Sequence, residues 1–212
     1  MKKTVWVNTV IRNEENFIWF ALMSVLNYVD KILVYDMGST DKTVEIIKTI
    51  KSSKIVLKQF PANTEMVTHA NLRKQMLIET KSDWVLLLDG DEIWLDASIK
   101  KLREEVEKTK SECIVVPTLM LLGDIYHYQE EKAGGYHIAG KVGHYNLRAF
   151  KRDIPGLHVE IHPNKQGYLR EGFFDEDGKL IYERGDKKIE VISAPYLHAS
   201  HLRRSSKDTD VV

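Results

Sequence analysis

The sequence predicts an α/β protein with a Rossmann-like layer, in which helices cover both faces of a mostly parallel central sheet. Over residues 4–121, apolar β-branched segments alternate with segments of helical periodicity. The expected strands are almost continuously apolar, which is typical of strands buried on both faces. Hydrophobic residues make up 43% of the 212-residue chain, enough for the core of one large domain. Strict alternation of strand and helix then indicates a parallel sheet.

The first elements show both patterns clearly. Residues 4–11 (TVWVNTVI) are apolar and β-branched and predict a buried strand, and residues 14–28 have apolar or small side chains at helical spacing. Residues 31–36 predict the second strand, and residues 39–41 (Ser, Thr, Asp) are typical N-cap types for the next helix. The other expected elements are, in chain order, a helix over 42–51, a strand over 53–60, a helix over 69–81, a strand over 83–89, a helix over 97–110 and a strand over 112–121.

The second half of the chain loses this rhythm. It is rich in Gly, Tyr and His at first, and residues 175–188 predict a hairpin with an Asp-Gly turn. We therefore expect residues 1–122 to form the α/β half of one domain. Residues 123–204 are expected to extend the same domain with irregular loops and antiparallel strands, and residues 205–212 to form a frayed tail.

Composition excludes several classes of protein. The 31 basic and 31 acidic residues give a formal net charge of zero, so no overall field attracts nucleic acid or anionic lipid. Cys113 is the single cysteine and predicts a buried free thiol. The chain begins like a signal peptide, but Asn8 and Arg12 interrupt its apolar part. No apolar run reaches the roughly 18 residues that span a bilayer. A soluble, cytoplasmic protein without a transmembrane segment is expected, with peripheral membrane association left open.

Three polar clusters follow expected strands at the edge where parallel α/β sheets bind ligands. Residues 12–16 (RNEEN) follow the first strand, residues 36–41 (DMGSTD) the second, and residues 89–92 (DGDE) the fourth. In open α/β sheets, ligands bind outside the carboxyl ends of the strands. The convergence of three such loops is more informative than any one of them.

Residues 89–92 suggest a metal site. Asp89 and Asp91 alternate with Gly90, so in an extended backbone both carboxylates point to the same side. Carboxylates crowded together repel each other unless a cation relieves them, and Mg²⁺ and Mn²⁺ prefer such oxygens. The alternative interpretation is an Asp-Gly turn that only ends a strand.

The other two loops have features of a binding site. Gly38 allows a tight turn, and Ser39 lies at a helix N-terminus, a place that favours anions or sugar hydroxyls. Asp36, at the strand end, is a candidate to bind a base or a ribose. Helix capping alone would also explain this loop. Likewise Glu14 and Glu15 would favour the positive end of a helix dipole without any ligand.

These motifs together resemble the family-2 glycosyltransferases. The segment VNTVIRNEENFIWFALMSVLNYVDKILVYDMGSTDKTVEI, followed by SDWVLLLDGDEIWL, is most similar to the branch with a Lys/Arg-Asn-Glu-Glu motif and an Asp-x-Gly-Ser-x-Asp loop. The resemblance covers residues 4–100, with three motifs in the same order and spacing. The second half matches only loosely.

The resemblance implies a GT-A fold and transfer of a sugar from a nucleotide diphosphate sugar with a divalent metal, Mn²⁺ or Mg²⁺. UDP is the common nucleotide of the family, and an inverting transfer is expected. A carbohydrate or glycolipid acceptor of a cell-surface polysaccharide or lipopolysaccharide is implied, and no nucleic-acid partner. By position, the residues expected at the nucleotide sugar are Arg12, Glu14, Asp36, Ser39, Arg73 and Asp89, and Asp91 is expected to coordinate the metal, with Asp89 at the ribose or the metal.

Two positions depart from the family pattern. Many relatives have a second Asp where this chain has Met37, which weakens the carry-over of the nucleotide contacts. Lys74 replaces the Asn of an Arg-Asn pair, so only Arg73 carries over.

The second half is expected to supply the general base that takes the acceptor proton. The segment YNLRAFKRDIPGLHVEIHP resembles a part of the relatives in which an acid lies next to His, and Glu160 is the first candidate. Asp153 and Asp124 are the alternatives. An exposed acid on an alternating strand would explain Glu160 equally simply.

Three further assignments have structural alternatives. The resemblance suggests that His198, ahead of His201, is a further metal ligand, although a hydrogen-bonded structural histidine is more common. Trp94 is proposed to stack on an acceptor sugar, or else to seat its loop on the core. Arg203 and Arg204 either reach the diphosphate or belong to a solvated tail.

Two other functions are compatible with an acid-rich strand edge. A catalytically inactive nucleotide-sugar-binding module would keep the same loops, and intact Asp89 and Asp91 argue against it. A sugar nucleotidyltransferase would need a glycine-rich, basic phosphate loop after the first strand, whereas residues 9–16 contain no glycine and two acids.

Overall fold

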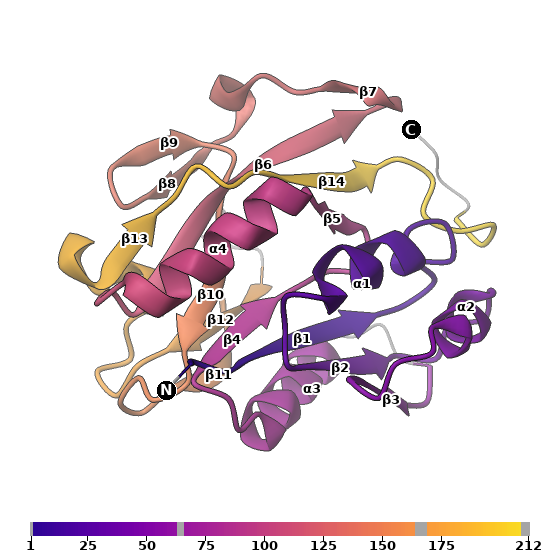
Figure 1. Cartoon of the computed structure of the whole chain (residues 1–212), viewed down its shortest axis with the longest axis horizontal. Helices are drawn as coiled ribbons and strands as arrows, with labels where there is room; N and C mark the ends of the chain where they lie inside the picture. Colours follow the sequence, from indigo (N-terminus) through magenta and orange to yellow (C-terminus); the bar gives the residue numbers. More distant parts are fainter. Residues whose placement is uncertain (1, 63–65, 164–168, 209–212) are drawn as a thin grey trace.

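The computed structural model describes residues 2–62, 66–163 and 169–208. The first half alternates strand and helix as predicted, and β1, β2, β3 and β4 are parallel neighbours (Figure 1). The elements are β1 (Val5–Ile11), α1 (Ile18–Leu26), β2 (Lys31–Asp36), α2 (Thr43–Thr49), β3 (Ile55–Gln59), α3 (Met66–Glu79), β4 (Trp84–Leu87), β5 (Glu92–Trp94) and α4 (Asp96–Lys108).

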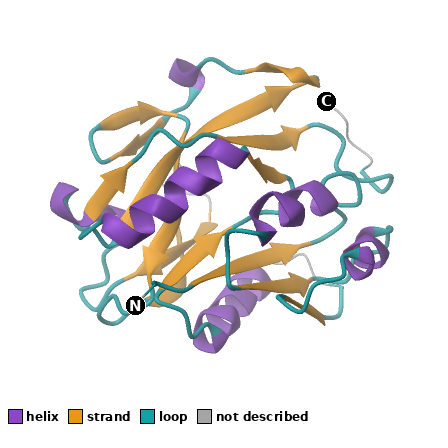
Figure 2. Cartoon of the chain, viewed as in Figure 1, coloured by secondary structure: helices purple, strands orange, loops and turns teal. Residues whose placement is uncertain are grey.

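The second half is richer in regular structure than its sequence suggests, and most of that structure is strand (Figure 2). Its elements are β6 (Cys113–Leu122), β7 (Asp124–Tyr128), η1 (Glu131–Ala133), β8 (Tyr136–Ile138), β9 (Lys141–Gly143), β10 (Tyr145–Lys151), β11 (His158–Pro163), β12 (Leu169–Phe174), η2 (Ile181–Glu183), η3 (Asp186–Lys188), β13 (Ile189–Val191) and β14 (Tyr196–His201).

One large sheet runs through both halves. Within the described residues its main path has the order β3-β2-β1-β4-β10-β6-β14-β5. β10 lies antiparallel between β4 and β6, and β14 lies parallel to β6 and antiparallel to β5. The boundary expected at residue 122 therefore does not divide the sheet, because the second half supplies central strands.

Helices cover both faces of this sheet, which confirms the predicted α/β class. The apolar sides of α1 and α4 pack on one face together with Val5, Val7 and Leu86. α3 lies on the other face, against β1 and the β11–β12 hairpin (Figure 1). In β1 the alternation of side chains places Val7 on the α1 side and Val10 on the α3 side.

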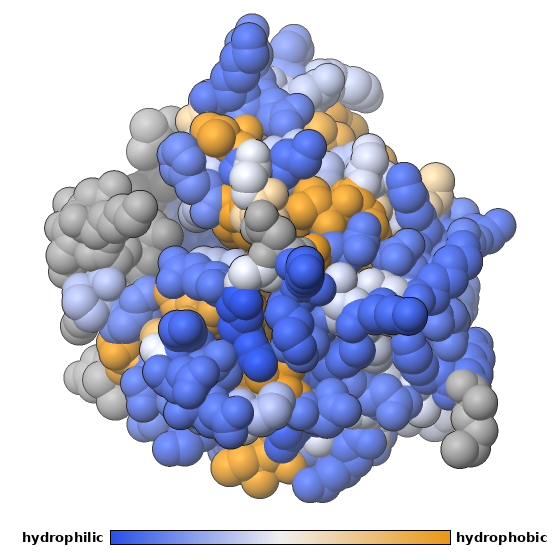
Figure 3. Space-filling model, turned by 90° about the vertical axis from the view of Figure 1, so that its left-hand side faces the viewer, coloured by the Kyte–Doolittle hydropathy of each residue, from blue (hydrophilic) through white to orange (hydrophobic). Residues whose placement is uncertain are grey.

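The surface and the single thiol agree with a folded globular domain. The side of the molecule seen in Figure 3 is mainly hydrophilic, with apolar side chains in separate patches. Cys113 is a buried free cysteine, as predicted. Among the described helices we find none with the length and hydropathy that a bilayer crossing requires.

The predicted hairpin over residues 175–188 is only partly correct. The Asp-Gly turn is present, and Phe174 pairs with Leu180 across it in an isolated antiparallel bridge. The chain then enters η2 and η3 rather than a second strand. Ile181 is completely buried, so its side chain holds the segment in the core where a hairpin strand would have continued along β12.

We expect Leu86→Ala to destabilise the fold strongly. Leu86 lies in the middle of β4 and is fully buried. Such a truncation removes apolar contacts and leaves a cavity, which costs about 2–5 kcal/mol. Urea unfolding would measure the change in the free energy of unfolding. Ile125→Ala, at a side chain that is 60% exposed, is the control and should change it by less than about 0.5 kcal/mol. Equal effects of the two variants would contradict the described core.

Candidate active site

The loops that follow β1 and β2 are joined by hydrogen bonds, as the convergence of the motifs predicts. The amide of Asn13 donates to Ser39 Oγ at 2.9 Å, and the amide of Thr40 donates to Asn13 Oδ1 at 2.8 Å. The amide of Glu14 donates to Thr43 Oγ1 at 2.7 Å. The two loops therefore form one continuous surface at the carboxyl ends of the parallel strands.

Asp36 is completely buried at the end of β2 and shapes the second loop. Its carboxylate accepts hydrogen bonds from the amide and the hydroxyl of Ser39. Gly38 has φ +75°, and a Cβ there would lie 2.5 Å from the backbone nitrogen of Ala62. Only glycine fits this turn, because other residues would meet both the strained backbone and the clash.

The acidic motif forms a turn and not the extended backbone that we expected. The amide of Glu92 donates to the carbonyl of Asp89 at 3.1 Å, and the amide of Asp89 donates to the Glu92 carboxylate at 3.1 Å. Gly90 packs on Glu14, whose Cγ would be 2.6 Å from a Cβ at this position. We call Glu14, Asp89, Asp91 and Glu92 the acid cluster.

Asp89 is held by arginines. Arg73, which is 4% exposed, donates to Asp89 Oδ1 at 2.9 Å and to the carbonyl of Asn8 at 3.0 Å. Arg148 lies 3.6 Å from the other oxygen. Burial acts to raise the pKa of Asp89, but the positive charges of Arg148 and Arg73 outweigh it, so the pKa is lowered. Asp89 therefore stays ionised.

Arg73 also links the acid cluster to the second half of the chain. Its Nε donates to Glu171 of β12 at 3.2 Å, and His69 Nδ1 lies 2.7 Å from the same carboxylate. Burial acts to raise the pKa of Glu171, but Arg73 and His69 outweigh it and the pKa is lowered. Sequence reasoning missed both His69 and Glu171.

Glu92 is fully buried and forms an ion pair with Arg148 of β10. Arg148 Nε also donates to the hydroxyl of Tyr196, on β14, at 2.9 Å. Burial raises the pKa of Glu92 to about 7, although the charge of Arg148 opposes the shift. The sequence analysis missed Arg148, because its segment, NLRAF, was compared with relatives only to find a general base.

Asp91 is almost fully buried, with a basic side chain near each of its two carboxylate oxygens. His198 Nε2 lies 3.5 Å from one of its oxygens, and Arg204 lies 4.0 Å from the other. Burial acts to lower the pKa of His198, but Asp91 outweighs it and the pKa is raised. Asp91 and His198 therefore face each other, and their role as metal ligands stays a prediction.

Glu14 packs against Gly90 of the acid turn, and its surroundings favour the protonated carboxyl group. Burial first, and then the charge of Asp91, raise the pKa of Glu14 to about 9, with Arg204 opposing the shift. Arg204 lies 3.2 Å from one carboxylate oxygen. The other oxygen, Oε2, is buried and has no hydrogen-bond partner among the described residues. Glu14 is thus neutral at pH 7 and crowded by acids.

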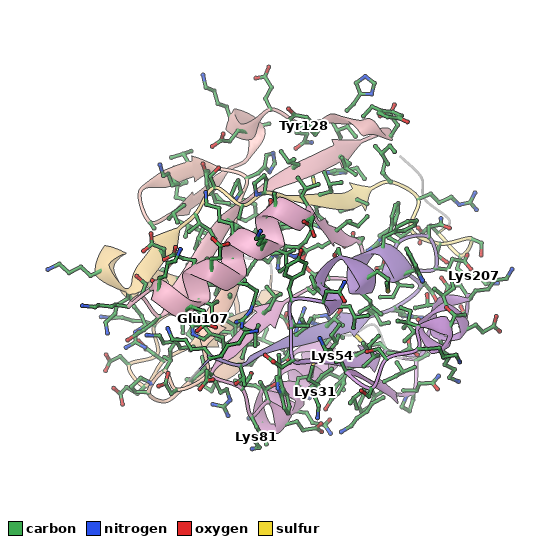
Figure 4. All side chains as sticks on the ribbon, in the orientation of Figure 1. Lys31, Lys54, Lys81, Glu107, Tyr128 and Lys207 are labelled. Carbon is green, nitrogen blue, oxygen red and sulfur yellow. The ribbon has the colours of Figure 1, made fainter. Side chains whose placement is uncertain are left out.

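The tail prediction was wrong for residues 205–208, which bind the two loops. Ser205 is completely buried, and its hydroxyl donates to Asp41 at 2.6 Å. The amide of Ser206 donates to Glu15 at 2.6 Å. Figure 4 accordingly shows Lys207 beside α2. Residues 209–212 lie outside the described part of the chain.

Two predicted site residues lie elsewhere. Trp94 is only 3% exposed and stacks on Tyr196 with ring centroids 5.3 Å apart, so the prediction that it stacks on an acceptor was wrong. Glu160 is exposed and lies 3.2 Å from His158. It pairs with Gly172 across the β11–β12 hairpin, so it lies on the opposite face from Glu171. The described contacts do not bring Glu160 to the acid cluster.

The remaining candidates are less informative. Arg12 is half-buried, and its Nε is without a hydrogen-bond partner among the described residues. His201 is exposed at the end of β14. No group of three or more His, Cys, Asp or Glu side chains is arranged for a metal ion within the described ranges. The protein alone therefore offers the Asp91–His198 pair rather than a complete set of ligands.

Comparisons with known proteins give a consistent result. The model of the family "Glycosyl transferase family 2" matches residues 6–173. A Rickettsia typhi protein named "Uncharacterized glycosyltransferase RT0209" is 34% identical over 98 residues, which is 46% of this chain and 30% of the relative. A similarly named Rickettsia bellii protein is 32% identical over 109 residues, 50% of this chain and 33% of that protein. The matched segment is thus about a third of the length of these relatives.

Solved structures share the fold at low sequence identity. S. aureus TarS 1-349 in complex with UDP has a TM-score of 0.56 and 16% identity, covering 92% of this chain and 60% of that one. Glucosyl-3-phosphoglycerate synthase from Mycobacterium tuberculosis, in complex with Mn²⁺ and UDP-glucose, has a TM-score of 0.56 and 17% identity, covering 92% and 71%. The predicted GT-A fold is confirmed by these neighbours. Because the family model spans most of the sheet and all three acidic loops, the chain belongs to glycosyl transferase family 2.

Proposed function

We propose that the chain transfers a sugar from a nucleotide diphosphate sugar, with UDP as the nucleotide, to an acceptor hydroxyl with inversion at the sugar carbon. The observation that carries the proposal is Asp91, an almost buried acid at the strand edge whose closest charged partners lie 3.5 and 4.0 Å away. A carboxylate and an imidazole that face each other 3.5 Å apart at the strand edge can both serve as metal ligands, so their place suggests a role in binding. Family membership and the nucleotide-bound neighbours support the class of reaction.

We assign a divalent cation, Mn²⁺ or Mg²⁺, to Asp91 and His198. The residues fit such an ion because Asp91 and His198 offer an oxygen and a nitrogen ligand, and Glu14 beside them has a buried oxygen without a hydrogen-bond partner among the described residues. Mg²⁺ is typically held by one or two protein carboxylates together with substrate phosphates, so the absence of a complete protein cage among the described residues is compatible with it. When bound, the ion would neutralise the charge on the departing diphosphate.

For Asp89, which was expected at the ribose or at the metal, we favour the ribose. Its pairing with Arg73 at 2.9 Å favours a contact with the ribose or a fixed charge beside the ion over direct coordination. We assign Asp36 and Ser39 to the nucleoside, because their loop lies beside that of Glu14. Arg12 begins the loop that carries Glu14, and we retain both residues as nucleotide contacts.

We propose Glu171 as the general base in place of Glu160. Within the described part of the second half, Glu171 is a carboxylate that reaches the acid cluster, through Arg73. Its lowered pKa keeps it deprotonated near neutral pH, the state in which it can accept the proton of the acceptor hydroxyl. In this view residues 1–122 bind the donor and residues 123–204 bind the acceptor, while Arg148 and His198 of the second half complete the donor side.

The alternative function is a nucleotide-sugar-binding module without catalysis. It would use the same loops and would bind the same nucleotides, so binding does not separate the two. Hydrolysis separates them, because an active transferase moves the sugar to water slowly when no acceptor is present.

We place the reaction in the cytoplasm and its product in a surface polysaccharide or lipopolysaccharide, as the family resemblance suggests.

UDP-sugars with Mn²⁺ are expected to stabilise the protein against heat. A ligand that binds only the folded state at 100 times its Kd adds about 2.7 kcal/mol of stability. Differential scanning fluorimetry with a panel of UDP-, GDP- and dTDP-sugars would measure the shift in Tm. Removal of the metal with EDTA should abolish most of the shift. Equal shifts with and without EDTA would contradict the metal assignment, and the absence of any shift would contradict the donor class.

Asp91→Asn should reduce UDP-sugar hydrolysis by at least about 10²-fold, since the amide keeps the shape but removes the charge that holds the cation. Release of UDP gives the rate, and circular dichroism checks that the fold is kept. Asp177→Asn, at an exposed turn position, is the matched control and should leave hydrolysis unchanged. Near-normal hydrolysis by Asp91→Asn would overturn its assignment.

Glu171→Gln should reduce sugar transfer by about 10²–10⁴-fold, the usual contribution of a general base. The KM for the donor should stay close to that of the unchanged protein, because the amide can still accept a hydrogen bond from Arg73. Glu160→Gln is the matched control and should retain transfer. If instead Glu160→Gln stopped transfer and Glu171→Gln did not, the original assignment of the base to Glu160 would be correct.

A further inference from the structure

A cavity of about 690 Å³ lies beside the acid cluster, in the second half of the chain. It is lined by the end of β4, by β8 and the residues before it, by the start of β10 and by the β11–β12 hairpin with the segment that follows it. Its volume is within the usual range for a small-molecule site. The donor loops after β1 and β2 contribute none of its described lining.

Three lining residues connect this cavity to the proposed donor edge. Leu87 ends β4, two positions before Asp89. Glu171 lines the cavity and accepts the hydrogen bond from Arg73, which also holds Asp89. Asn146 lines the cavity and donates to the hydroxyl of Tyr196 at 3.2 Å. A molecule in the cavity would therefore lie one side chain away from the acid cluster.

The lining has the chemistry of a site for a neutral polyhydroxyl ligand. The described ionisable groups include Glu171, Glu183, His137 and His162, and no lysine or arginine is among the described lining residues. Carboxylates and an amide accept hydrogen bonds from sugar hydroxyls. A phosphate or carboxylate on the ligand would instead require arginine or lysine and would be repelled by Glu183, and also by Glu171, whose charge Arg73 offsets in part.

Aromatic and apolar side chains complete the lining. Phe173 and Leu147 form apolar wall, and Tyr136, which is 39% exposed, lies at the cavity with its ring partly open to solvent. A ring with an apolar face and a polar edge is suited to the C–H face of a sugar. Hydrogen-bond acceptors on one side and aromatic surface on another are the features that a saccharide ring requires.

We propose that this cavity binds the acceptor, and that the acceptor is a neutral saccharide whose hydroxyl group faces Glu171. The inference rests on the proposed function, because it takes the acid cluster to be the donor site. It adds that Glu171 and Glu183 select against phosphorylated or carboxylated acceptors.

The substrate class can be tested with matched acceptors. UDP release from the donor that the protein hydrolyses would be measured with methyl glucoside, methyl galactoside and methyl N-acetylglucosaminide, and with glucose 6-phosphate and glucuronic acid. A neutral saccharide should raise UDP release at least 10-fold above hydrolysis, and the anionic sugars should not. Greater stimulation by an anionic sugar, or no stimulation by any neutral saccharide, would overturn the inference.

The place of binding can be tested by filling the cavity. Gly135 lines it, and a Cβ at this position would have no atom within 4 Å, so Gly135→Trp adds bulk there without a clash at the first carbon. This variant should keep donor hydrolysis and raise the KM of the neutral acceptor at least 10-fold. Val142→Trp adds bulk to an exposed position of the neighbouring β9, outside the lining, and should change neither.

A second variant tests selectivity without bulk. Glu183→Lys should improve the use of glucose 6-phosphate relative to methyl glucoside at least 5-fold, because it replaces a repelling charge by an attracting one. An unchanged ratio, or an unchanged acceptor KM in a folded Gly135→Trp, would contradict the inference. If the unsubstituted protein hydrolysed no nucleotide sugar at all, that result would contradict the proposed function itself and not only the acceptor site.

Discussion

The balance of buried charge at the carboxyl ends of the strands is the constraint on which the site depends. Four acids gather there, and burial alone would drive them to protonate, as it does for Glu14, whose pKa rises to about 9. Asp89 remains ionised because Arg73 and Arg148 are close to it. Leaving either arginine without its partner would bury an uncompensated charge, which is strongly destabilising. The sheet must therefore place each buried acid within reach of an arginine.

Strands from both halves of the chain place these charged side chains close together. Arg148 comes from β10, which pairs antiparallel with β4, the strand that leads into the acid turn. His198 comes from β14, which pairs with β5 directly after the turn. The two strands thus bring Arg148 to Asp89 and Glu92, and His198 to Asp91. Without β10 and β14 the acid cluster would keep Arg73 of α3 but lose Arg148 and His198.

The C-terminal segment, which lies outside the sheet, adds a further positive charge to the acid cluster. Arg204 lies 3.2 Å from Glu14, and Ser205 is buried against the loop that carries Asp41. These contacts join the C-terminal segment to Glu14 of the acid cluster and to the loop before α2. Residues that look like a solvated tail in sequence are thereby part of the surface next to the proposed donor site.

The sequence alone determined the α/β class, the order of the early elements and the three polar loops, because strand burial and helix periodicity are local patterns. It also identified Asp36, Asp89 and Asp91 as strand-end acids. It did not reveal Arg148 or Glu171, and it misplaced Glu160 and Trp94. These roles depend on which strand pairs with which and on the face each residue occupies, and a shift of one residue in register reverses that face. Only the tertiary structure decides such long-range pairing.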